Sequence, residues 1–295
     1  MIRFPAHYPG YQPLIAAAGT RTELWRLILG LMIIATGYIA IGQFYFDVIF
    51  GLNPDIDIDT AGTPGGMMAL LISFGCLTLA VIGCVLVLHG RGLWSLIGPG
   101  RLWWRGFVLA LGAAAVLNIA LVILPPWSAY GGELQRGLHV PSWLMLLPVS
   151  LLAVFIQTSA EELLFRGYLQ QQLAARFASP WVWMVIPSAL FALGHYMPAQ
   201  AGSNAVMIAI WAGVFGLLMA DLTARSGSLG PAMAVHFLNN VIAMLIISVP
   251  DDLNGLALYI LPFGMADEAA LAPWLWVDLA VMLTTWLAVR LALRR

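Results

Sequence analysis

The hydrophobic positions of this chain gather into long continuous runs, and short polar loops separate the runs. Most runs are near the ~20 residues that a helix needs to cross a hydrocarbon core of about 30 Å. The fourth run is longer than one perpendicular crossing requires, and Pro148 is expected to kink it. The pattern predicts eight membrane-spanning helices over residues 24–50, 66–89, 103–124, 143–172, 181–199, 204–223, 230–249 and 273–292.

Composition supports the membrane assignment. Hydrophobic residues make up 61% of the 295 positions and charged residues only 9%, whereas soluble proteins carry about 25% charged residues. We therefore expect an all-α polytopic membrane protein, with about eight helices around an intramembrane cavity. It would form one integral membrane domain over residues 1–295, with a motif-bearing core at about 143–249. Its surface would contact the lipid bilayer, and the net charge of −1 gives no sign of nucleic acid as a partner.

The arginines predict the orientation of the helices, because cytoplasmic loops carry an excess of basic residues. If eight segments alternate, nearly all arginines fall on one side and the loop acids fall on the other, with Arg136 as the exception. The sequence thus predicts a multi-pass protein of the bacterial inner (cytoplasmic) membrane with both termini cytoplasmic. The arginines on that side are Arg3, Arg21, Arg26, Arg91, Arg101, Arg105, Arg166, Arg176, Arg225, Arg290, Arg294 and Arg295; the opposite acids are Asp55, Asp57, Asp59, Glu133, Asp251, Asp252, Asp267 and Glu268.

The fourth hydrophobic run carries two adjacent carboxylates, Glu161 and Glu162, and a nearby Arg166. A charged side chain at the bilayer centre costs at least ~2.5–3.5 kcal/mol, so such residues are candidates for a functional site. Glu162 and Arg166 have the i, i+4 spacing of a local ion pair on one helix. Glu161 is rotated by about 100° from Glu162. It is therefore left without a partner on its own helix.

Two further hydrophobic runs carry histidines at helical spacing from other distinctive side chains. Phe191 and His195 have i, i+4 spacing, and so do His236 and Asn240. Asn239, at i+3 from His236, could share the same helix face in place of Asn240. Taken singly, a core histidine or an interhelical hydrogen bond explains each pair. Taken together with the unpaired acid, they predict that three helices converge on a polar cavity in the cytoplasmic half of the membrane.

This set of side chains suits hydrolysis by an activated water molecule. A carboxylate in an apolar pocket can act as a general base, and an imidazole can hold the water beside it. A second histidine and an amide can donate hydrogen bonds to a developing oxyanion. The sequence has no Gly-x-Ser-x-Gly or His-Glu-x-x-His motif, and Cys76 and Cys84 read as packing residues without a histidine on their segment.

Two alternatives remain open at this stage. Zinc could be bound by Glu161, His195 and His236, since histidines and carboxylates are its usual ligands. The same polar cavity could instead serve binding in a non-enzymatic protein, either a transporter or an immunity or scaffold protein.

Three linked motifs resemble the CPBP family of membrane proteins, which includes the Ras-converting CAAX prenyl endopeptidases and many bacterial relatives. The resemblance covers about residues 150–245. The motifs are Glu161-Glu162-x-x-x-Arg166, Phe191-x-x-x-His195 and His236-x-x-x-Asn240, in the order of the family.

The resemblance implies an intramembrane endopeptidase of eight helices whose cavity opens toward the cytosol. It implies that Glu161 and His195 activate water, and that His236 and Asn240 stabilise the oxyanion. It favours a metal-free mechanism without a cofactor, and a peptide or protein substrate, with prenylated proteins among the candidates. The residues expected to support the site are Glu162, Arg166 and Phe191.

Overall fold

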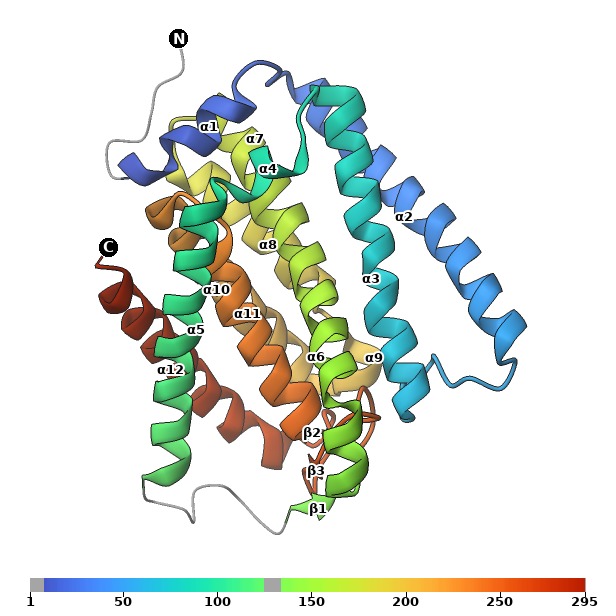
Figure 1. Ribbon diagram of the computed structural model, residues 1–295. Helices are drawn as coiled ribbons and strands as arrows, with labels where there is room; N and C mark the ends of the chain where they lie inside the picture. Colours follow the sequence, from blue (N-terminus) through green and yellow to red (C-terminus); the bar gives the residue numbers. More distant parts are fainter. Residues whose placement is uncertain (1–7, 125–133, 295) are drawn as a thin grey trace.

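The computed structural model describes residues 8–124 and 134–294, and it is a bundle of long apolar helices (Figure 1). Arg3, Glu133 and Arg295, which contribute to the predicted orientation, lie outside these ranges. The expected all-α polytopic membrane fold is confirmed. In the described ranges, six helical segments are long and apolar enough to cross a membrane: Leu24–Leu52, Pro64–His89, Gly100–Ile123, Val140–Arg176, Pro198–Ser226 and Glu268–Leu293.

Several of these segments are composites of shorter elements. The first three contain α2 (Leu24–Leu52), α3 (Pro64–Cys84) with a π-helical end (Val85–His89), and α5 (Gly100–Ile123). The fourth joins α6 (Val140–Glu162), a π-helical stretch (Leu163–Leu169) and α7 (Gln170–Arg176). The last two contain α9 (Pro198–Ala201), a 3₁₀ turn (Gly202–Asn204) and α10 (Ala205–Ser226), and then α12 (Glu268–Leu293).

Two of the eight predicted spans are shorter than expected. The predicted segment 181–199 is a helix over Trp181–Gly194, made of a π-helical turn (Trp181–Val185) and α8 (Ile186–Gly194). It ends there because His195 leaves the helical region at φ −103° and ψ 3°. The predicted segment 230–249 is a helix over Gly230–Ile246, made of α11 (Gly230–Val241) and a π-helical turn (Ile242–Ile246).

Neighbouring helices explain how these short helices are accommodated. Figure 1 shows α11 between α5, α6 and α10, and it contacts all three. Helix α8 packs against α10. Irregular backbone at membrane depth is tolerated where protein surrounds it, so a helix inside the bundle need not span the full bilayer.

The fourth segment is continuous over Val140–Arg176 and, as predicted, is longer than one perpendicular crossing requires. Pro148 lies inside α6, and the kink expected there stays a prediction. Its regular α-helix ends at Glu162, where the π-helical stretch begins. A π-helical turn shifts the faces that later residues present, and such turns are frequent at functional sites. The candidate acids therefore lie at the point where the helix changes register.

The two ends of the bundle carry small additional elements. At the end that is uppermost in Figure 1 lie a 3₁₀ turn (Pro9–Tyr11), α1 (Gln12–Ala18) and α4 (Leu93–Ile97), where Tyr11 packs against Trp183 with ring centroids 5.3 Å apart. At the other end three two-residue strands, which the sequence did not predict, form a sheet of order β1-β3-β2. Strand β3 (Tyr259–Ile260) pairs antiparallel with β1 (Gln135–Arg136) and parallel with β2 (Ile247–Ser248).

Many large apolar side chains point outward from the bundle, as expected where lipid is the solvent. On α2, for example, Ile28 is 59% exposed and Phe44 is 70% exposed. The two cysteines, in contrast, are free and buried, which confirms them as packing residues. The chain is therefore a multi-pass membrane protein whose polar groups are the exception in its interior.

Candidate active site

The predicted polar residues lie on three neighbouring parts of the bundle. The acids end α6, the arginine lies in the π-helical stretch that follows, one histidine follows α8, and the other histidine and the amides lie in α11. The residues are Glu161, Glu162, Arg166, Phe191, His195, His236, Asn239 and Asn240.

Glu162 lies at the centre of a buried charged cluster. Its Oε1 accepts hydrogen bonds from Arg166 Nη1 at 2.7 Å and from His236 Nδ1 at 2.8 Å. The side chains of Glu162 and Arg166 are 0% and 1% exposed. The predicted ion pair is therefore present, but the interpretation as a purely local pair was incomplete, because α11 packs against α6 and brings His236 to the same oxygen. Burial of charges is tolerated when they are paired and hydrogen-bonded in this way.

Glu161 has a different environment from its neighbour. Its Oε2 lies 3.4 Å from Nε2 of His236, on the opposite edge of the ring from Glu162. This Oε2 atom is buried and has no hydrogen-bond partner among the described residues. A buried acceptor without a donor costs about 1–3 kcal/mol. The Oε2 of Glu162 also has no partner among the described residues, but the side chain of Glu162 is 0% exposed whereas that of Glu161 is 14% exposed. Glu161 is thus the more accessible acid of the pair.

His195 is oriented by the end of its own helix. Its Nδ1 lies 2.9 Å from the backbone oxygen of Phe191. A carbonyl oxygen can only accept, so Nδ1 carries the proton and donates, and in the neutral ring Nε2 is an acceptor. The ring of Phe191, one helical turn earlier, packs against the imidazole, with ring centroids 4.4 Å apart.

Phe191 joins the separate parts of the cluster. Its ring lies 6.0 Å from that of His236, and the guanidinium of Arg166 lies 4.9 Å from its centroid. Phe215 of α10 packs edge-on to His236 at 4.9 Å, and Trp211 stacks on Phe215 at 5.5 Å. The rings of Phe191 and Phe215 pack against the imidazole of His236, whose side chain is 4% exposed.

Asn240 is held by a residue that sequence reasoning did not assign to the site. Its Nδ2 donates to Oε1 of Gln157 at 2.8 Å, and its Oδ1 accepts from Nδ2 of Asn239 at 3.1 Å. Gln157 is 5% exposed and lies one helical turn before Glu161. That i, i+4 spacing was the available signal, because it places both side chains on one face of α6.

The donor set does not have the arrangement of a metal centre. Both ring nitrogens of His236 face carboxylate oxygens, and Nδ1 of His195 is occupied by a backbone carbonyl. Within residues 8–124 and 134–294, no group of three or more His, Cys, Asp or Glu side chains is placed to hold a metal ion. Zinc binding by Glu161, His195 and His236 therefore has no support in the described contacts, and it stays an untested alternative.

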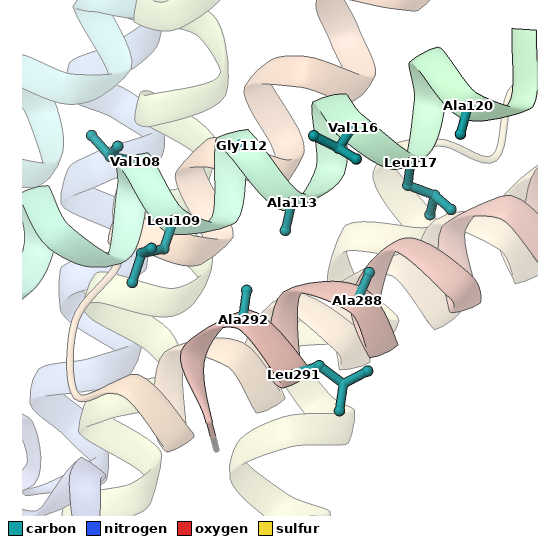
Figure 2. Close-up of a pocket in the computed structure, with 10 residues that line it drawn as sticks. All are labelled: Val108, Leu109, Gly112, Ala113, Val116, Leu117, Ala120, Ala288, Leu291 and Ala292. Carbon is teal, nitrogen blue, oxygen red and sulfur yellow. The ribbon is translucent and has the colours of Figure 1, made fainter. Parts of the chain in front are cut away.

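One hollow of the bundle lies away from these residues. It is a groove of about 610 Å³ between α5 and α12, lined by apolar side chains (Figure 2). The expected intramembrane cavity around the acids and histidines stays a prediction.

Comparison with known proteins finds a family match for the segment that carries the candidate site. Residues 141–242 match the family model described as type II CAAX prenyl endopeptidase Rce1-like. An uncharacterized protein of Bacillus subtilis (strain 168), YyaK, is 26% identical over 245 residues, which cover 79% of this chain and 81% of the relative. No solved structure matches the chain. The resemblance seen in the motifs is thus confirmed, and the matched residues include both acids, both histidines and Asn240.

Proposed function

We propose that this chain, whose residues 141–242 match the Rce1-like family model, is an intramembrane endopeptidase in which Glu161 activates water. The observation that carries the proposal is the contrast between the two acids. Glu162 is engaged by Arg166 and His236 through one oxygen, and its side chain is 0% exposed, although its Oε2 also lacks a donor. The side chain of Glu161 is 14% exposed, and its Oε2 beside His236 has no donor among the described residues. A water molecule that donates to this oxygen would satisfy it and would be placed for proton transfer.

The proposed reaction uses the carboxylate of Glu161 and Nε2 of His195. Glu161 takes a proton from water while the water oxygen bonds to the carbonyl carbon of the scissile peptide. Nε2 of His195 accepts the second hydrogen of that water as a hydrogen bond, since its Nδ1 donates to the carbonyl of Phe191.

The carbonyl oxygen then carries the negative charge of the tetrahedral intermediate. The second N–H of the Asn240 amide and Nε2 of His236, when protonated, are the donors we assign to it. As the intermediate collapses, the C–N bond breaks and protonated Glu161 returns its proton to the leaving amine. Water, acid and amine therefore balance without a further reactant, and we propose that no metal takes part.

We further propose that the substrate is a peptide or protein presented from the cytoplasmic side of the bacterial inner membrane. Prenylated C-terminal peptides are the first class to test, because the matched family model is described as a prenyl endopeptidase.

The test is cleavage of a library of prenylated and unmodified C-terminal peptides by the purified full chain. Glu161→Gln keeps the size of the side chain but removes the base, and we expect cleavage to fall by at least ~10²-fold, the lower range for loss of general base catalysis. Glu23→Gln is the matched control, since Glu23 is an exposed acid that pairs with Arg26 far from the site. A chelator should leave the rate unchanged.

Full activity in a folded Glu161→Gln protein would overturn the proposal. Loss of activity with the chelator, restored by zinc, would overturn the metal-free mechanism. Binding of peptides without any cleaved product by the wild type would favour the non-enzymatic alternative.

A further inference from the structure

The groove between α5 and α12 has no role in the proposed reaction. Small residues and branched apolar residues line it together. Figure 2 shows Ala113 of α5 and Ala288 and Ala292 of α12 pointing into the space between the two helices, and Gly112 also lines it. The walls are exposed apolar side chains, with Val116 69% and Leu291 78% exposed. A groove of about 610 Å³ with such a lining, on two membrane-spanning helices, faces the hydrocarbon chains of the lipid.

Three arginines lie at one end of this groove. Arg105 lies one helical turn before Val108 and Leu109, which line the groove, so it shares their face of α5. Arg101 lies a further turn back, and Arg294 follows the lining residue Ala292 at the end of α12. All three arginines are exposed, and none forms an ion pair with any other residue in the described ranges.

A neighbouring tryptophan marks the depth of these arginines in the membrane. Trp104 directly precedes Arg105 and is 63% exposed. Exposed tryptophans concentrate at the level of the lipid headgroups. The apolar groove therefore runs from the hydrocarbon region to a basic rim at headgroup depth.

We propose that this groove is a binding site for an anionic phospholipid, with an acyl chain in the groove and the headgroup phosphate at Arg101, Arg105 and Arg294. Basic pockets between transmembrane helices on the cytoplasmic side are suited to anionic headgroups. The guanidinium groups supply charge-assisted, bidentate donors for phosphate. The observation that carries the proposal is this juxtaposition of a lined apolar groove with unpaired arginines.

A second copy of the chain fits the same groove less well. A symmetric contact places the same surface patch of both copies together. Each copy would then bring its own basic rim close to that of the other. Repulsion between the rims disfavours such a dimer, whereas an anionic headgroup neutralises them.

The experiment measures lipid binding to the purified full chain by native mass spectrometry, with phosphatidylglycerol and phosphatidylcholine of the same acyl chains. The double variant Arg101→Gln/Arg105→Gln should weaken phosphatidylglycerol binding by about 25-fold, or about fivefold for each basic side chain near an anionic headgroup. It should leave phosphatidylcholine binding unchanged. Arg176→Gln is the matched control, because Arg176 is exposed at the same end of the bundle but lies on α7.

A third variant tests the groove itself. A Cβ at Gly112 would meet no atom within 4 Å, so Gly112→Leu should fold and fill the space for the acyl chain. We expect it to weaken the binding of both lipids. Equal binding of the two lipids by the wild type would overturn the proposal, and so would an equal effect of Arg176→Gln. A wild-type dimer that Gly112→Leu dissociates would assign the groove to a second copy instead.

Discussion

At the residue scale, the two adjacent glutamates show how neighbouring side chains of one type acquire different chemistry. Glu162 shares one oxygen between Arg166 and His236 in a fully buried cluster. Removing one partner of such a pair typically costs about 3–5 kcal/mol, since it leaves an uncompensated buried charge. Glu162 therefore links α6 to α11 through its bond with His236. Glu161, one residue earlier, has an oxygen beside the same imidazole without a donor among the described residues, and we propose that this oxygen activates water.

The hydrogen bond from Asn240 to Gln157 predicts a positioning role for the glutamine. Gln157→Leu removes the acceptor that orients the Asn240 amide, so the amide is no longer held toward the oxyanion. We expect kcat to fall by about tenfold, or about 1.4 kcal/mol of transition-state stabilisation, with little change in KM. Steady-state kinetics with a cleaved peptide substrate would measure both constants.

A conservative variant separates this role from a structural one. Gln157→Glu retains an acceptor oxygen at the same distance along the side chain and should recover most of the lost kcat. If both variants change only KM, or only the thermal stability, then Gln157 does not orient the oxyanion donor.

At the scale of the elements, the position of α11 depends on close backbone contact with α5. A Cβ on Gly230 would overlap the backbone carbonyl of Trp103, and a Cβ on Gly106 would lie 2.9 Å from the ring of Pro231. The first turn of α11 therefore lies directly against α5. That contact fixes the helix that carries His236 and Asn240 relative to α5.

Two glycine substitutions test this packing with opposite expected signs. Gly230→Ala forces the two helices apart, and we expect a loss of about 1–3 kcal/mol of stability, the usual cost of overpacking. Gly112→Ala, in the same bundle, meets open space and should gain up to about 1 kcal/mol from helix propensity. Thermal unfolding of both purified proteins in the same detergent gives the comparison. Equal transition temperatures would show that the α5–α11 contact is not limiting.

At the scale of the whole molecule, the bundle has two chemically distinct ends. Helices α1, α4 and α7 lie at one end, and the small sheet with its neighbouring loops lies at the other (Figure 1). Exposed Arg176 belongs to the first end, and exposed Asp59 lies in the loop between α2 and α3 at the second. The distribution of basic residues predicts that the first end is cytoplasmic.

Cysteine labelling in intact cells tests this orientation. In a background with Cys76→Ala and Cys84→Ala, we expect Asp59→Cys to react with a membrane-impermeant maleimide. Arg176→Cys should react only after the membrane is permeabilised, because the reagent cannot reach the cytoplasm. Labelling of Arg176→Cys in intact cells would reverse the predicted topology.

The sequence by itself determined the class of the protein and the identity of its unusual residues. Long apolar runs have no stable alternative to helices in a bilayer, since every backbone polar group must be satisfied within the chain. Charged and amide side chains in those runs are few, so Glu161, Glu162, His195 and His236 could be selected without any structure. The local pairs at four-residue spacing, Glu162 with Arg166 and Phe191 with His195, were predictable for the same geometric reason.

Only the tertiary structure decided how these residues combine across helices. Hydropathy carries no information about which helices are neighbours, so neither the contact of His236 with both glutamates nor the bond from Asn240 to Gln157 could be predicted. It also does not distinguish a π-helical turn from a regular one, which left the register after Glu162 unknown. The shorter helices around His195 and His236 escaped prediction because apolar residues suit the interior of a bundle as well as lipid. The candidate site is formed by packing between helices that are distant in the chain. That packing depends on the shapes of the side chains that meet, and the hydropathy pattern carries no information about them.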